Sequence, residues 1–198
     1  MPMSTKRRIG IVAYPDVQDL DIVGPADAFA SARLLETGGI TQPYEILLIG
    51  LSSKPVVSES GIVFQPKHSV HDAPRLDTLL VPGGRGLRIQ PAIQARVAAW
   101  VQSQARRTRR IAAVCTGVYA IAPTGLLDGR QVTTHWRFAD DFAARFPKVK
   151  VQPNSLYAKD GAFYSSAGIT AGIDLSLALI EEDFGPRVAL GVRPDIEC

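Results

Sequence analysis

Short aliphatic runs alternate with longer helical patterns along most of the chain, and this alternation limits the possible folds more than any other feature. Buried parallel strands appear as short, nearly continuous aliphatic runs, and each is joined to the next through a helix. The pattern therefore predicts one α/β domain over residues 1–198, with a mostly parallel central sheet and helices on both faces. The expected strands are 9–14, 44–50, 78–84 and 111–115, the expected helices are 25–36, 92–105, 118–127 and 171–185, and a small β excursion is expected over 52–70.

The composition is that of an ordinary globular protein. Of the residues, 46% are hydrophobic and 21% are charged, which suits a sizeable core and argues against disorder. The net charge is only +3, and the one dense basic run, residues 105–110, follows a helical pattern. We interpret this run as a solvated last helical turn whose cations suit the negative end of the helix dipole. No direct binding of nucleic acid by this chain is expected.

The N-terminal segment and the cysteines indicate where the protein works. The first apolar run is about five residues long, shorter than the ~7–15 of a signal peptide and the ~20 of a membrane span. Cys115 and Cys198 are far apart and offer neither a disulfide framework nor metal-ligand spacing. We therefore expect a cytoplasmic protein with no membrane partner, no metal and no cofactor.

Cys115 lies where an apolar run ends and a helical pattern begins, in the stretch IAAVCTGVYA. A thiol at a strand-to-helix turn is exposed by the turn, and the helix N-terminus lowers its pKa, so that the thiolate becomes a nucleophile. The alternative is a small apolar side chain packed under the sheet, which is common for a free cysteine. The ten residues alone support both interpretations.

Three segments follow predicted strands and should meet at one edge of the sheet, because ligands of such sheets bind outside the carboxyl ends of the strands. They are 14–24, 82–86 and 115–116. In the second segment, Gly83 and Gly84 offer backbone N–H groups that could approach a ligand closely and stabilise a developing negative charge. In the first, Asp21 lies between two aliphatic residues, which should raise its pKa and let it carry a proton.

Other polar residues are weaker candidates. His135 ends a short β-like run beside Trp136, and a histidine there is more often structural than a catalytic base. Asp16 is interpreted as a turn residue and Asp19 as facing solvent, before a helix expected to begin at Pro25.

Four blocks in order resemble the ThiJ/PfpI family of the class I glutamine amidotransferase-like superfamily. They are YPDVQDLDIVGPADAFASA, LLVPGGRG, AAVCTGVYAIAPTGLLDGRQVTTHW and SSAGITAGIDLSLALIEEDFG, within residues 8–190. The resemblance implies a flavodoxin-like α/β sandwich, frequently a homodimer, with Cys115 at the elbow. Within the family the chain is most similar to the effector domains of AraC-type regulators and to isonitrile hydratases.

The resemblance to isonitrile hydratases implies roles for single residues. Their Cys-Thr elbow corresponds to Cys115 and Thr116, and their acid in a Leu-Asp block just before Gly-Pro corresponds to Asp21, with Gly24 beginning the Gly-Pro pair. The implied reaction is attack of Cys115 on the isonitrile carbon, protonation by Asp21 and hydrolysis to a formamide. PfpI proteases have histidine directly after the cysteine, and Thr116 stands there instead, so proteolysis is not expected. His135 joins the candidate catalytic residues, and Gly24 joins the two glycines of the second block as a candidate ligand contact.

The regulators share the same elbow and acid, so these residues do not separate a sensor from an enzyme. Stretches in the second half, above all LALIEEDFG, are closer to the regulators, and this lineage is favoured: a domain that binds a small-molecule ligand without turnover. Gly191 and Pro194 are expected to break the last helix and to leave no room for a recognition helix. A free-standing hydratase is the second hypothesis, and a redox sensor based on oxidation of Cys115 is the third.

Overall fold

A seven-stranded sheet forms the centre of the computed structural model, which describes residues 6–37, 39–168 and 170–196. The strand order is β12-β13-β9-β8-β1-β4-β7, and every neighbouring pair is parallel except β12 and β13. The mostly parallel sheet predicted from the aliphatic runs is confirmed. The strands are β1 (Arg7–Ala13), β4 (Tyr44–Gly50), β7 (His68–Ser69), β8 (Thr78–Val81), β9 (Arg110–Val114), β12 (Tyr157–Asp160) and β13 (Phe163–Ser166).

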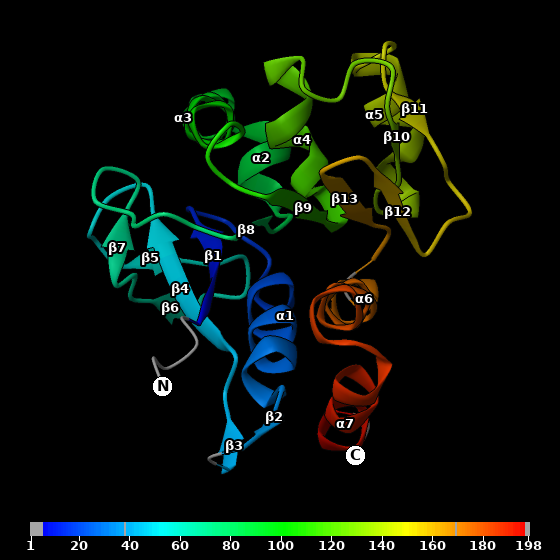
Figure 1. The fold of residues 1–198 in the computed structure, drawn as a ribbon. Helices are drawn as coiled ribbons and strands as arrows, with labels where there is room; N and C mark the ends of the chain where they lie inside the picture. Colours follow the sequence, from blue (N-terminus) through cyan, green and yellow to red (C-terminus); the bar gives the residue numbers. More distant parts are fainter. Residues whose placement is uncertain (1–5, 38, 169, 197–198) are drawn as a thin grey trace.

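Helices cover both faces of this sheet, as the flavodoxin-like sandwich requires (Figure 1). One face carries α1 (Asp19–Ser31), α6 (Ala171–Phe184) and α7 (Pro186–Ile196). The other carries α2 (Arg85–Ile89), α3 (Pro91–Gln104) and α4 (Val118–Ile121), with α5 (Ala139–Arg145) beside two short strands. The remaining elements are β2 (Leu34–Glu36), β3 (Gly39–Thr41), β5 (Val56–Val57), β6 (Val63–Phe64), β10 (Gln131–Val132), β11 (Lys150–Val151) and the 3-10 turns Cys115–Gly117, Ala122–Thr124 and Trp136–Phe138.

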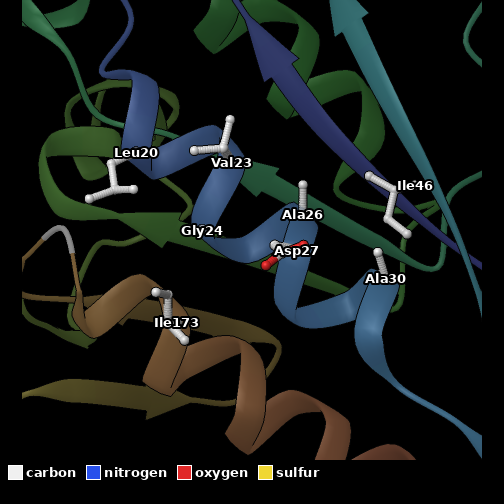
Figure 2. Close-up of a pocket in the computed structure, with 8 residues that line it drawn as sticks. All are labelled: Leu20, Val23, Gly24, Ala26, Asp27, Ala30, Ile46 and Ile173. Carbon is white, nitrogen blue, oxygen red and sulfur yellow. The ribbon is translucent and has the colours of Figure 1, made fainter. Parts of the chain in front are cut away.

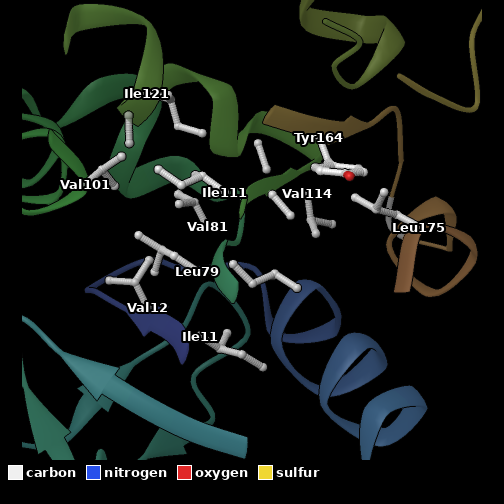
Figure 3. Close-up of a cluster of buried hydrophobic side chains, with 14 of the residues drawn as sticks. Ile11, Val12, Leu79, Val81, Val101, Ile111, Val114, Ile121, Tyr164 and Leu175 are labelled. Carbon is white, nitrogen blue, oxygen red and sulfur yellow. The ribbon is translucent and has the colours of Figure 1, made fainter. Parts of the chain in front are cut away.

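The core fills the space between the sheet and its helices. Successive side chains of a strand point to opposite faces, so each central strand packs against helices on both sides. Figure 3 shows Val101 of α3 and Ile121 of α4 on one side of β9, and Leu175 of α6 on the other. All five residues of β9 are buried, which explains why its sequence is a continuous apolar run after the first residue.

The first helix differs from the prediction at both ends. It begins at Asp19, not at Pro25, because the side chain of Gln18 accepts a hydrogen bond from the first N–H of the helix. Pro25 is therefore inside the helix, where it cannot donate the usual bond to the carbonyl of Asp21. The helix ends at Ser31, and the remainder of the predicted segment forms β2, which pairs with β3 in an antiparallel hairpin.

The interpretation of the basic run 105–110 as a solvated helix end fits its exposed residues 106 and 107 and is wrong for Arg110. Helix α3 ends at Gln104, and Arg110 lies in β9 with only 2% of its surface exposed. Its guanidinium binds Asp183 of α6, whose side chain is fully buried and also pairs with Arg109 and Arg7. The run therefore joins β1, β9 and α6 at the end of the sheet where these strands begin.

The last helix also continues further than expected. Helix α7 runs from Pro186 to Ile196 through both Gly191 and Pro194, so the expectation that these residues break it is wrong. Within the described parts of the chain, no helix is both long enough and apolar enough to cross a membrane.

Candidate active site around Cys115

Three neighbouring strands, β1, β8 and β9, end at the same edge of the sheet, and the candidate residues follow them. The chain passes from β1 to β4 on one side and returns through β8 on the other, so the strand order reverses beside β1. A crevice at such a reversal is the usual ligand site of open α/β sheets. Tyr14, at the end of β1, ties this edge together because its hydroxyl donates to the carbonyl of Pro82 over 2.6 Å.

Cys115 is held in a sharp turn between β9 and α4. Its φ of 57° is unusual for a residue with a side chain and marks a strained backbone that its surroundings must hold in place. Thr134 does so by donating its hydroxyl to the carbonyl of Cys115 over 2.8 Å. Gly117 does so by having no side chain, because a Cβ there would lie 2.0 Å from the carbonyl oxygen of Val81.

Asp21 is fully buried in the first turn of α1, next to this turn. Burial raises its pKa to about 7, against a partial lowering by hydrogen bonding to Gly83 and Cys115. The backbone N–H of Gly83 donates to Oδ2 over 2.9 Å, while Oδ1 makes no hydrogen bond of ordinary geometry to the described residues. The result is an acid, close to the cysteine, that is half-protonated near neutral pH.

The pKa of Cys115 is raised, so the expected free thiolate is absent. Burial is the main cause and the negative charge of Asp21 adds to it, whereas hydrogen bonds from Thr116 lower the pKa only in part. Of the two interpretations of Cys115, the exposed thiolate is not supported, because the residue is only 7% exposed and because α4 has only four residues. In this structure Cys115 is therefore a thiol beside a carboxyl group, and each group affects the pKa of the other.

The amides of Gly83 and Gly84 are occupied, which corrects their expected role as free donors for a ligand. Gly83 binds Asp21, and Gly84 donates to the hydroxyl of Thr116 over 3.0 Å. A Cβ at Gly83 would lie 2.7 Å from the N and Oγ1 atoms of Thr116 and 2.8 Å from Oδ2 of Asp21. These glycines therefore hold the acid and Thr116 beside Cys115.

A cavity of about 90 Å³ opens at Cys115. His135 lines it as a neutral ring, because burial and the charges of Arg137 and Arg88 lower its pKa, and its Nδ1 accepts the N–H of Arg137. Trp136 stacks on it and is 75% exposed. The lining residues are Gln18, Glu59, Gly84, Arg88, Cys115, Thr116, His135 and Phe138.

Sequence reasoning missed three of these residues: Gln18, Glu59 and Arg88. Arg88 lies one turn beyond the Pro-Gly-Gly segment, and its position after a strand was the only available signal. Glu59 comes from the turn of the β excursion, which nothing in the sequence places at this edge.

Gly24 does not belong to this cavity. It faces α6, where a Cβ would lie 3.1 Å from Ile173, and lines a separate apolar groove of about 520 Å³ between α1 and α6 (Figure 2). Its proposed role as a contact for the ligand of Cys115 therefore has no geometric support. Among the described residues, no three His, Cys, Asp or Glu side chains gather in a way that could hold a metal ion.

The sequence profile of the DJ-1/PfpI family matches residues 7–182. The chain belongs to this family. Isonitrile hydratase from Pseudomonas putida is 33% identical over 192 residues, which cover 96% of this chain and 78% of that enzyme. A solved ThiJ/PfpI family protein from Pseudomonas syringae has a TM-score of 0.84 at 27% identity and covers 99% of this chain and 76% of that one.

Regulators are also similar to this DJ-1/PfpI chain. The HTH-type transcriptional regulator GbdR of Pseudomonas aeruginosa is 29% identical over 176 residues, which are 89% of this chain and 47% of the regulator. The chain thus spans about half the length of that regulator. The family relationship includes an enzyme and regulators, and the choice between them depends on the site.

Proposed function

We propose that this DJ-1/PfpI chain is a cysteine-dependent hydratase that converts isonitriles to N-substituted formamides. One observation carries the proposal: Cys115 lies beside a buried acid, Asp21, whose pKa is about 7. A proton carrier works best when its pKa is near the working pH. The similarity to isonitrile hydratase from Pseudomonas putida supports this substrate class.

In the first step, the carboxylate of Asp21 takes the thiol proton of Cys115 as the sulfur attacks the terminal carbon of the isonitrile. A carbon–sulfur bond forms, and Asp21 passes the same proton to that carbon. The product is a thioimidate attached to Cys115, with a hydrogen on carbon and a double bond to nitrogen. Because the proton moves within the pair, this step needs no free thiolate in the resting protein.

In the second step, water adds to the thioimidate carbon. The carbon–sulfur bond breaks, its electron pair returns to sulfur, and the sulfur regains a proton. The N-substituted formamide leaves, so one water is consumed and nothing is oxidised. We assign Thr116 to positioning, because its N–H and hydroxyl face Cys115, and neutral His135 to the attacking water.

The proposal is tested by mass spectrometry of formamide after incubation with methyl isocyanide and with isocyanoacetate. We expect formation of formamide by the wild-type chain and loss of at least about 100-fold in Cys115→Ala and Asp21→Asn, as for groups that act as a unit. Cys198→Ser is the matched control and should keep the wild-type rate. No formamide above the level of Cys115→Ala would disprove the enzyme.

A second candidate function is the ligand-sensing domain of an AraC-type regulator. It is favoured by the 7% exposure of Cys115, which suits a binding cavity better than rapid turnover, and by the similarity to GbdR. It predicts binding of a small molecule with no product. Helix-turn-helix segments encoded downstream of Cys198 would support it, and their absence would weaken it.

We also propose that the chain forms a homodimer through the groove between α1 and α6. Leu20 and Val23 of α1 are 41% and 43% exposed, and the groove is mostly apolar (Figure 2). A twofold dimer places the same patch of both copies together, which suits an apolar helix face. Asp21 lies on the same helix, so the second copy would stand beside the cavity of Cys115.

A further inference from the structure

Arg88 is a half-buried cation that the described part of the chain leaves without an ion-pair partner. Its guanidinium lies over the ring of Phe138, with the central carbon 4.0 Å from the ring centroid. Its backbone is fixed as well, because Arg145 donates to its carbonyl. Its neighbour Arg85, by contrast, is paired with Asp16.

Stacking on an aromatic ring fixes a guanidinium without using its donors. The N–H groups lie in the plane of the guanidinium, so its edge stays available for two parallel hydrogen bonds to a carboxylate. Phe138 therefore orients Arg88 and leaves its recognition edge unoccupied. A planar, oriented donor of this kind is the usual partner of a bound carboxylate.

Arg88 and Cys115 line the same cavity. The charge of Arg88 acts on two other residues of the lining, since it lowers the pKa of Cys115 and that of His135. None of the other ionisable groups that face the cavity forms an ion pair with Arg88 in the described part of the chain. His135 is neutral, Asp21 is half-protonated behind Cys115, and exposed Glu59 accepts the backbone N–H of Arg85.

We propose that Arg88 binds the carboxylate of a small ligand whose other end meets Cys115. The inference rests on the proposed function, in that this cavity takes the ligand, and it narrows the substrate class to small isocyano carboxylates. A volume of about 90 Å³ is well below the roughly 300–1,000 Å³ of pockets for drug-sized ligands, so the cavity suits a small ligand. A single unpaired cation beside Glu59 also matches a monoanion better than a phosphate dianion.

Iodoacetate and iodoacetamide test the inference without any need for turnover. Both alkylate a thiolate: the sulfur–carbon bond forms, the carbon–iodine bond breaks and iodide leaves with the electron pair. They are close in size and differ in charge, and rates are measured by mass spectrometry of the peptide that contains Cys115. Each rate is divided by the rate with free cysteine to remove intrinsic reactivity.

We expect wild-type Cys115 to favour iodoacetate and Arg88→Gln to lose about tenfold of that preference, as for a hydrogen bond to a charged group. Arg88→Lys, which keeps the charge but loses the two parallel N–H donors, should show an intermediate preference for iodoacetate. Arg85→Gln removes the same charge from the same helix and should keep the wild-type preference. The iodoacetamide rate should fall in Arg88→Gln, because loss of the charge raises the pKa of Cys115, and this effect cancels in the ratio of the two rates. Continued labelling by iodoacetamide in all three variants shows that the cavity remains folded.

The possible failures are distinguishable. If iodoacetamide labels Cys115 but the preference is the same in wild type and Arg88→Gln, the carboxylate site is wrong and the hydratase proposal is unaffected. If formamide is never formed but the preference is lost in Arg88→Gln, the site stands and the hydratase fails. If neither reagent labels Cys115, the carboxylate site is wrong, and the hydratase, which needs no free thiolate in the resting protein, is judged by formamide alone.

Discussion

The backbone N–H of Gly83 donates to Oδ2 of Asp21 over 2.9 Å, and this bond crosses from the end of β8 to the first turn of α1. It leaves the other carboxyl oxygen, Oδ1, without a partner of ordinary geometry in the described residues. A buried carboxyl group with one fixed and one unoccupied oxygen is oriented and remains able to exchange a proton. Gly83 therefore positions the acid that the proposed chemistry needs.

Replacement of Gly83 by alanine should displace both neighbours of Cys115. The new Cβ would lie within 2.8 Å of Asp21 and Thr116, and the crowding should cost about 1–3 kcal/mol of stability. A shift of about 1 Å in the acid should lower kcat/KM for formamide roughly 100-fold. Gly191→Ala is the control, since a Cβ there meets nothing within 4 Å, and its activity should be unchanged.

The rate of formamide formation should rise with pH through about 7 and then level off. The active pair holds one proton, so the rate falls when Asp21 is protonated while Cys115 keeps its thiol proton. The plateau should be broad, because the pKa of Cys115 is raised above its usual range. A pH profile of kcat/KM measures this. A rise of the rate that occurs well below pH 7 would contradict the assignment to Asp21.

The variant His135→Gln distinguishes Asp21 from His135 as the group whose titration causes the rise of the rate near pH 7. Burial and the charges of Arg137 and Arg88 hold the pKa of His135 below its usual value. Loss of the histidine should therefore leave the rise of the rate near pH 7. If the rise of the rate disappears in this variant, the titrating group is His135 and not Asp21.

Asp21→Asn should make the stability of the protein less dependent on pH. The pKa of Asp21 is near 3.8 when unfolded and about 7 when folded, so wild-type stability falls as pH rises between these values. The shift corresponds to about 4 kcal/mol, so the variant should gain up to that amount relative to wild type between pH 4 and pH 8. Urea unfolding at both pH values measures the difference, and equal slopes for the two proteins would refute it.

Asp183→Asn should destabilise the protein strongly without a direct effect on the site. It removes the partner of buried Arg110, which lies 2.6 Å away, and a broken buried pair costs about 3–5 kcal/mol. The pKa of Asp183 is lowered in the folded protein, so its contribution exists at neutral pH and is lost as the solution becomes acidic. Glu45→Gln, which breaks an exposed pair with Arg8, should cost about 1 kcal/mol or less.

Val23→Asp should abolish the proposed dimer. The charge would lie in the apolar groove between α1 and α6, where a second copy could bury it only at a large cost. Val63→Asp introduces the same change at another exposed valine and should keep the dimer. Light scattering coupled to gel filtration measures the mass, and an unchanged mass in Val23→Asp would place the interface elsewhere.

The sequence predicted the parallel sheet because its strands are buried on both faces and therefore continuously apolar. The same reasoning failed for residues 34–36, whose apolar residues suit a helix and a hairpin equally. It also failed for Arg110, because an arginine buried against Asp183 has the same local sequence as a solvated one. Partners distant in the chain decide such cases.

The candidate site shows the same division. The rule that ligands bind beyond the carboxyl ends of strands brought Asp21, Gly83, Thr116 and Cys115 to one edge, as the structure has them. The raised pKa of Asp21 was also predicted from its aliphatic neighbours. The protonation of Cys115 was not, because the pKa of a thiol depends on burial that only the packed structure shows. The preference also changed: the second half of the sequence favours a sensor, whereas the pKa of about 7 of Asp21 beside Cys115 favours an enzyme.

The ion cluster around Asp183 lies at the opposite end of the strands from Cys115. Arg7 and Arg110 fasten the starts of β1 and β9 to α6, while the loops after those strands form the cavity. The ion cluster and the candidate active site thus lie at opposite ends of the sheet. Mutations that reshape the cavity loops leave the anchor intact, so such a chain can acquire a new ligand, or exchange catalysis for sensing, without losing its fold.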